Sequence, residues 1–159
     1  DTVLNRAVSL SPEAREVSFY VLNGDGLSTI DHEEALRACA RNPALKITAT
    51  YKVKTIQVEE ILKDHFQRGI TILSIDLEGI EEEILEQINL EKYKPWIIVL
   101  ENIPYRPTLS IDEREYKGRS LLEKSGYTEY AFTGINSIFL CRDIVERFNQ
   151  KRIKELQGE

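Results

Sequence analysis

Two patterns of hydrophobic residues occur along the chain, and they predict two kinds of strand. Residues 16–22 (EVSFYVL) and 47–58 (ITATYKVKTIQV) place apolar side chains at every second position, as strands with one exposed face do. Residues 70–75, 96–100 and 137–141 are almost continuously apolar, which is expected of central strands that helices cover on both faces. We therefore expect two half-exposed, antiparallel strands followed by the centre of a covered sheet.

Between these strands lie segments with the periodicity or the capping residues of helices. Residues 57–66 and 79–90 carry their apolar side chains on one stripe, so each is expected to pack on a sheet. Capping residues predict a short helix over 31–40 and another over 110–126, where Ser110 and Glu113 have capping-box spacing. A polar helix is expected over 143–156.

The order of these elements predicts an α/β fold. From residue 70 onward strands and helices alternate, which is typical of a parallel sheet. The two strands predicted within residues 127–143 are joined by a loop too short for a helical crossover, so the last strand is expected to run antiparallel to its predecessor. We expect a single domain over residues 1–159, with a mostly parallel sheet that ends in a reversed C-terminal hairpin.

Composition narrows the classes of function. The formal net charge of -6 argues against nucleic acid as a partner, and no apolar run is long enough to cross a membrane. Cys39 and Cys141 have no paired-ligand spacing, so we expect reduced thiols and a cytoplasmic location. His32 and His65 have no second ligand at a useful spacing, and no metal site is expected.

Carboxylates follow two of the predicted central strands. Asp76 comes after residues 70–75, and Glu101 comes after 96–100. Ligands of open α/β sheets bind beyond the carboxyl ends of the strands, so we expect both carboxylates at one crevice, where they suit a general base, a cation site or a hydrogen bond to a hydroxyl. Alternatively, the charge of Asp76 only favours the positive N-terminus of the next helix, and for Glu78 this is the preferred interpretation.

Other motifs carry less chemistry. Residues 81–83 (EEE) are expected to form a solvated helix face. The segment NGDGLST has two glycines after a strand but lacks the lysine and the spacing of a phosphate-binding loop, so we interpret it as a flexible turn. The chain has no glycine-flanked serine nucleophile and no plausible Cys and His pair, and hydrolase chemistry has no support.

Several ordered segments resemble the FkbM-type methyltransferase family. They include LNRAVS, FYVLNGDGLSTI, YKVKTIQVEEIL, ILSIDLEGIEEEIL, KPWIIVLE, LLEKSGY and GINSIFLCRD, so the similarity runs along nearly the whole chain. Its D-x-E-G-x-E core corresponds here to Asp76, Glu78, Gly79 and Glu81.

The resemblance implies an S-adenosylmethionine-dependent methyltransferase with a seven-stranded class I, Rossmann-like sheet. Such enzymes usually methylate a hydroxyl of a sugar, glycan or small metabolite. By the resemblance, Asp76 is the expected base and Glu101 assists acceptor binding, while Ser28, Thr29 and Glu78 line the acceptor side. Positioning of the acceptor and removal of its proton would then supply most of the catalysis.

One part of the family pattern has no counterpart in this chain. Family members carry, upstream, an Asp-x-Gly-x-x-x-Gly loop that holds the cofactor and a strand whose last acidic residue binds the ribose. We therefore expect the cofactor-binding residues to lie upstream of Asp1, in the first two strands of a domain that is incomplete at its N-terminus. A chain without those strands is expected to be inactive alone and to self-associate through an unpaired strand edge.

Two other functions stay open. A non-catalytic α/β interaction module would use the same scaffold, with its acidic residues serving only as helix caps. A phosphoacceptor or magnesium-binding domain also places an aspartate at a strand end, but the chain has no acidic cluster early in its sequence to complete such a site.

Overall fold

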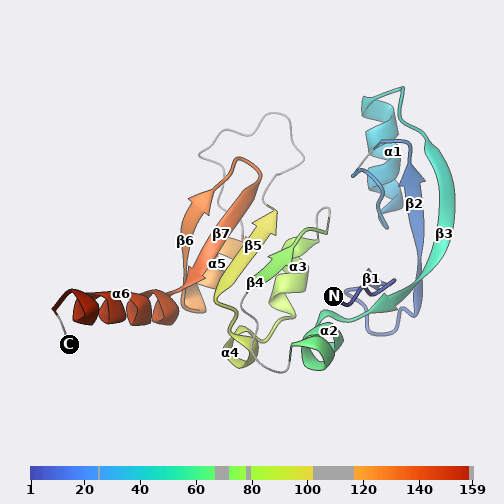
Figure 1. Ribbon diagram of the computed structural model, residues 1–159. Helices are drawn as coiled ribbons and strands as arrows, with labels where there is room; N and C mark the ends of the chain where they lie inside the picture. The colour runs from blue at the N-terminus through green and yellow to red at the C-terminus, as the bar shows by residue number, and fades with distance from the viewer. Residues whose placement is uncertain (25, 67–71, 78–79, 102–116, 158–159) are drawn as a thin grey trace. The chain divides into compact units, whose positions relative to one another are not determined.

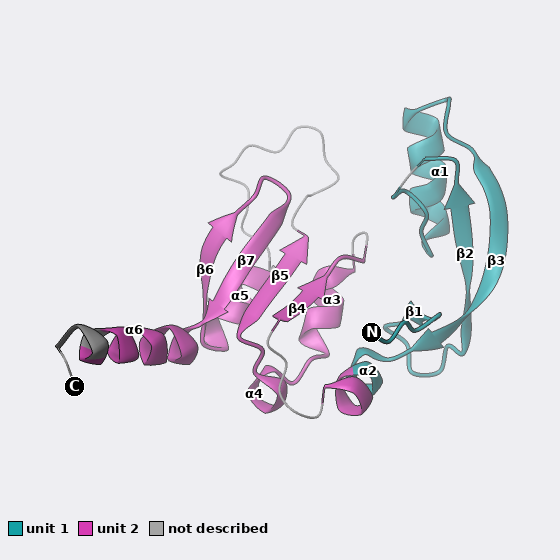
Figure 2. Cartoon of the chain, in the orientation of Figure 1, with its two compact units in different colours: residues 1–61 teal, residues 62–159 magenta. Residues whose placement is uncertain are grey.

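The structure is a computed structural model, and it describes residues 1–24, 26–66, 72–77, 80–101 and 117–157 (Figure 1). The chain divides into two compact units, residues 1–61 and residues 62–159 (Figure 2). We describe each unit by itself.

Unit 1 is built on a three-stranded sheet with the order β1-β3-β2. Strand β2 (Glu16–Leu22) pairs antiparallel with β3 (Ile47–Ile56), and β1 (Ala7–Val8) pairs parallel with the last residues of β3. The antiparallel pair is the one expected from the alternating pattern. Along β3 the exposed side chains include Thr48, Thr50, Lys52 and Lys54, so the expected exposed face is confirmed.

Helix α1 (His32–Arg41) of unit 1 begins at the predicted cap. The Asp31 Oδ1 accepts hydrogen bonds from the backbone N–H groups of Glu33 and Glu34, at 2.8 and 3.1 Å. These bonds satisfy two of the donors that the first turn of a helix leaves free. Helix α2 (Val58–His65) follows β3 directly, so the strand ends two residues before its predicted boundary.

Unit 2 is built on a four-stranded sheet with the order β4-β5-β7-β6. Strands β4 (Ile72–Ile75) and β5 (Ile97–Glu101) are parallel, whereas β7 (Asn136–Cys141) runs antiparallel to both β5 and β6 (Tyr127–Phe132). The antiparallel pairing of the last two strands confirms the argument from loop length.

The position of β4 differs from the prediction of a central strand. Strands β5 and β7 are central, but β4 lies at the edge of the four-stranded sheet, and Ile72 is 56% exposed. An apolar run shows that a strand needs cover on its faces, but it does not show which strands will pair with its edges.

The helices of unit 2 are α3 (Glu81–Glu86), α4 (Leu90–Tyr93), α5 (Lys117–Lys124) and α6 (Arg142–Gln157). The single helix predicted over 79–90 is wrong in its length, because Asn89 starts a new helix by accepting a hydrogen bond from the Lys92 N–H. Helix α5 stops before Gly126, whose φ of 91° belongs to the left-handed region. Ser110 and Glu113 lie outside the described residues.

The core of unit 2 joins its sheet to α3 and α5. Its fully buried side chains include Ile84, Leu85, Ile98, Leu100, Leu122, Tyr127 and Phe139. The Tyr127 hydroxyl donates a hydrogen bond of 2.8 Å to the Pro95 carbonyl, and burial raises the pKa of this tyrosine well above its ordinary value. A hydroxyl that stays protonated and bonded can be buried at little cost.

Candidate functional site

Three carboxylates of unit 2 lie together at the end of its parallel strand pair. One carboxylate oxygen from each of Asp76, Glu81 and Glu101 lies within 4.8 Å of the other two. Asp76 is exposed, Glu101 is partly exposed and Glu81 is buried. We refer to these three residues as the carboxylate cluster.

Strand register brings the first two members of the carboxylate cluster together. In the parallel pair Ile75 lies opposite Leu100, so the next residues, Asp76 and Glu101, stand beside each other where β4 and β5 end. This is the edge at which α/β sheets bind ligands. The sequence predicted this juxtaposition from the position of each carboxylate after an apolar run.

Glu81 is the member whose environment the sequence did not predict. It begins α3, and its Oε1 accepts a hydrogen bond of 2.7 Å from the Leu77 N–H. The prediction that residues 81–83 form a solvated helix face is therefore wrong for two of the three side chains. Glu81 is only 9% exposed and Glu82 is half-buried, whereas Glu83 is exposed. A carboxylate in the first turn of a helix also benefits from the helix dipole, which offsets part of the cost of burial.

Asp76 makes no capping hydrogen bond to α3, and the alternative that its charge favours the N-terminus of this helix stays a prediction. The N-cap position of this helix is Ile80, which makes no side-chain capping bond, and the loop N–H of Leu77 is bound by Glu81. Asp76 makes no hydrogen bond or ion pair with another described residue. Its carboxylate therefore remains available to a ligand.

The carboxylate cluster concentrates negative charge in a small volume. Like charges at this separation repel each other, so the arrangement favours a bound cation or hydrogen-bond donors on a ligand. Carboxylate oxygens suit Mg²⁺, Mn²⁺ or Ca²⁺, and they suit a positively charged organic group equally well. The cluster can also take a proton from a hydroxyl held beside it.

The residues expected on the acceptor side lie in unit 1 or outside the described residues. Ser28 and Thr29 belong to unit 1, where the Ser28 Oγ accepts from the Leu22 N–H at 3.3 Å and the Thr29 Oγ1 accepts from the Asp31 N–H at 3.0 Å. Thr29 is also buried and pairs with Tyr20 through its backbone. Both hydroxyls thus hold the turn before α1, and a role in acceptor binding stays a prediction. Glu78 lies outside the described residues.

The remaining polar candidates have structural surroundings. His32 stacks on Tyr20, with 4.7 Å between ring centroids. Cys141 is buried, Cys39 is partly buried, and both are free thiols. Among the described residues, none of the helices is long and apolar enough to span a bilayer.

Comparison with known proteins gives one match. The model of the methyltransferase FkbM domain matches residues 2–127, a span that contains the carboxylate cluster. No curated protein and no solved structure matches the chain.

Proposed function

Because the chain belongs to the FkbM methyltransferase domain family, we propose that it transfers a methyl group from S-adenosylmethionine to a hydroxyl of a sugar, glycan or small metabolite. The observation that carries this proposal is the meeting of Asp76 and Glu101 at the ends of two parallel strands, inside the span that matches the family. We place the protein in the cytoplasm, a location that its free thiols favour.

The proposed fold is the class I, Rossmann-like sheet of the family. The order β4-β5-β7-β6, with β7 reversed, is what one half of such a sheet requires. In the proposed sheet β4 would be a central strand, with further strands of the same domain pairing along its second edge. This assignment would explain why the apolar run of β4 is typical of a covered strand.

The carboxylate cluster fits the charge of the proposed cofactor. The sulfonium and ammonium groups of S-adenosylmethionine are cations, and the carboxylates of Asp76 and Glu101 would favour a positive charge beside them. We assign no described residue to its adenosine. When bound, S-adenosylmethionine supplies an electrophilic methyl group.

Each member of the cluster has a distinct proposed role. Asp76, which is exposed and follows the strand, would accept the proton of the acceptor hydroxyl as its oxygen becomes nucleophilic. Glu101 would accept a hydrogen bond from the same or a neighbouring hydroxyl and so orient the acceptor. Buried Glu81 would act as a positioning residue, because it accepts a hydrogen bond from the N–H of Leu77, the residue that directly follows Asp76.

An acceptor screen tests the proposed activity. The natural protein is incubated with S-adenosylmethionine and a panel of sugars, polyols and hydroxylated metabolites, and release of S-adenosylhomocysteine is measured. We expect release that depends on an added hydroxyl acceptor. If no acceptor supports release and calorimetry detects no S-adenosylmethionine binding, the alternative of a non-catalytic interaction module replaces the proposal.

Binding of a divalent cation is a second candidate function, favoured by the three converging carboxylates. Addition of Mg²⁺ or Mn²⁺ would then raise the melting temperature of the protein, because a ligand that binds only the folded state stabilises it. Glu101→Gln should abolish this increase, whereas Glu83→Gln, which alters an exposed carboxylate of the same unit, should keep it. Equal increases in both variants would place the cation elsewhere.

A further inference from the structure

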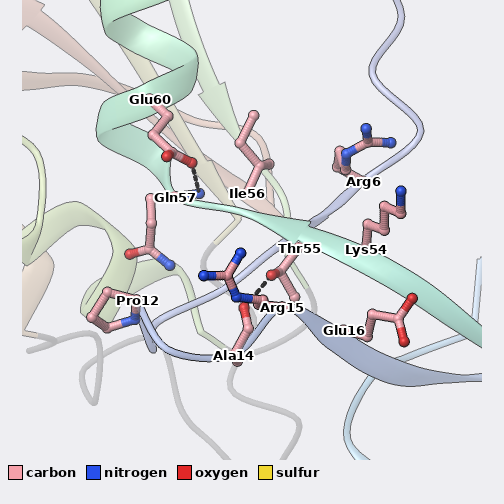
Figure 3. Close-up of a pocket in the computed structure, with 10 residues that line it drawn as sticks. All are labelled: Arg6, Pro12, Ala14, Arg15, Glu16, Lys54, Thr55, Ile56, Gln57 and Glu60. Carbon is pink, nitrogen blue, oxygen red and sulfur yellow. Dashed lines mark hydrogen bonds between the residues drawn. The ribbon is translucent and has the colours of Figure 1, made fainter.

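Unit 1 contains a pocket of about 890 Å³ (Figure 3). The pocket lies where β2 begins, β3 ends and α2 starts, and all of its lining residues belong to unit 1. Its volume is in the range of small-molecule sites.

Three cationic side chains from separate segments line this pocket. Arg6 precedes β1, Arg15 precedes β2 and Lys54 lies near the end of β3. The side chains of Arg15 and Lys54 make no hydrogen bond or ion pair with another described residue, and Arg6 donates only to the adjacent Asn5 carbonyl. Glu16 lies opposite Lys54 in the strand register but forms no ion pair with it. Cations gathered in a concave surface attract an anionic group.

Two carboxylates line the same pocket, and their presence indicates a ligand with hydroxyl groups. Glu16 and Glu60 add acceptors beside the three cations, and Glu60 is held by a hydrogen bond of 3.1 Å from the Gln57 N–H to its Oε2 (Figure 3). A carboxylate accepts hydrogen bonds from hydroxyls but repels a second anion. The lining therefore fits one anionic group attached to a hydroxylated body better than it fits a polyanion.

A second pocket, of about 550 Å³, also has Arg6 and Lys54 in its lining. It adds the aromatic rings of Phe19 and Tyr51, which lie opposite each other on β2 and β3. Tyr51 is 60% exposed, so its ring is accessible. Because side chains alternate between the two faces of a strand, both rings lie on the face opposite the Lys54 side chain, and neither ring lines the larger pocket.

From the charged lining of the larger pocket we propose that it binds a polyhydroxylated molecule that carries a single phosphate or carboxylate group. Arg15, Lys54 and Arg6 bind the anionic group, and Glu16 and Glu60 accept hydrogen bonds from the hydroxyls. The inference is independent of the proposed function, because every residue that lines this pocket belongs to unit 1.

Calorimetric titration of the natural protein at low salt tests the proposal. Glucose 6-phosphate and glucuronate are the probes, and glucose and inorganic phosphate are the controls; the tighter of the two probes identifies the anionic group. Arg15→Gln and Lys54→Gln should each weaken binding by about three- to tenfold, between the effect of an exposed ion pair and that of a charge-assisted hydrogen bond. Lys46→Gln removes an exposed lysine of unit 1 outside both pockets and should leave the affinity unchanged.

The proposal would be overturned if wild type, Arg15→Gln and Lys54→Gln bound the probes with equal affinity. It would also be overturned if neither probe bound at millimolar concentration. A third contrary result is glucose or inorganic phosphate binding as tightly as glucose 6-phosphate. Asp76→Asn separates this proposal from the proposed function, because that variant should bind the probe normally. Probe binding without methyl transfer to any acceptor would contradict the proposed function alone.

Discussion

Tyr127 is a fully buried side chain of unit 2 whose one polar atom is satisfied by a single bond, from its hydroxyl to the Pro95 carbonyl. Tyr127→Phe keeps the ring but leaves that carbonyl without its donor, so we expect a loss of about 1 to 2 kcal/mol in the free energy of unfolding. Urea denaturation measures this loss. Tyr130→Phe is the matched control, because Tyr130 is 75% exposed and its hydroxyl should contribute little.

The Lys94–Asp143 ion pair of unit 2 gives a dependence on pH. Its hydrogen bond and charge interaction lower the pKa of Asp143 and raise the pKa of Lys94. The stabilisation from Asp143 is present above its unfolded pKa, near 4, and disappears as pH falls through its lower folded pKa. For Lys94 it disappears as pH rises through the raised folded pKa.

Asp143→Asn should therefore lower the melting temperature slightly at neutral pH. The difference from wild type should vanish in strong acid and shrink in high salt, because both partners are about half exposed. Melting curves at several pH values measure it. An unchanged difference at low pH would show that the asparagine acts through something other than charge.

At the residue scale, the sequence predicted that Asp76 and Glu101 would lie together, but it wrongly predicted that Glu81 would be exposed to solvent. The juxtaposition of Asp76 and Glu101 follows from the general rule that residues at the carboxyl ends of neighbouring parallel strands lie at one edge of a sheet. The burial of Glu81 depends on the loop at Leu77 turning its N–H onto the side chain, and helical periodicity carries no information about such a loop. The cations of the unit 1 pocket were missed because Arg6, Arg15 and Lys54 meet only after β1, β2 and β3 pair.

At the scale of elements, the N-cap residue of a short helix determines where that helix begins. Asp31→Ala removes the acceptor for two backbone N–H groups of α1 and should destabilise unit 1 by about 1 kcal/mol. Asp31→Ser keeps a capping oxygen and should restore most of this loss. Thermal unfolding followed by circular dichroism compares the two variants, and equal losses would exclude capping as the cause.

Element boundaries also show what the sequence could not specify. The predicted apolar stripe over 79–90 is buried, but it does not lie on one helix. Ile84 and Leu85 belong to α3, Ile88 lies in the turn after it, and Leu90 begins α4. The Asn89 side chain competes with helix continuation by capping α4. Periodicity identifies the buried face, whereas local side-chain bonds determine where one helix stops and the next begins.

At the scale of the whole molecule, the second edge of β4 pairs with no other described strand. An apolar edge with free backbone groups invites pairing with another chain, so we expect residues 1–159 alone to self-associate as concentration rises. Light scattering measures the mass of this species. Ile72→Lys should reduce association, and Ile135→Lys, at an exposed position away from β4, should not. A monomer at all concentrations would contradict this use of the β4 edge.

The central claim concerns Asp76 as the proton acceptor of a methyltransferase. The most direct measurement is S-adenosylhomocysteine release by the natural protein, with an acceptor found in the screen, for wild type, Asp76→Asn and Glu83→Gln. We predict that Asp76→Asn keeps the fold and lowers the rate about 10²- to 10⁴-fold, the usual contribution of a general base, while Glu83→Gln, at an exposed position of α3, keeps a rate close to wild type. A folded Asp76→Asn variant with a rate close to wild type would contradict the account.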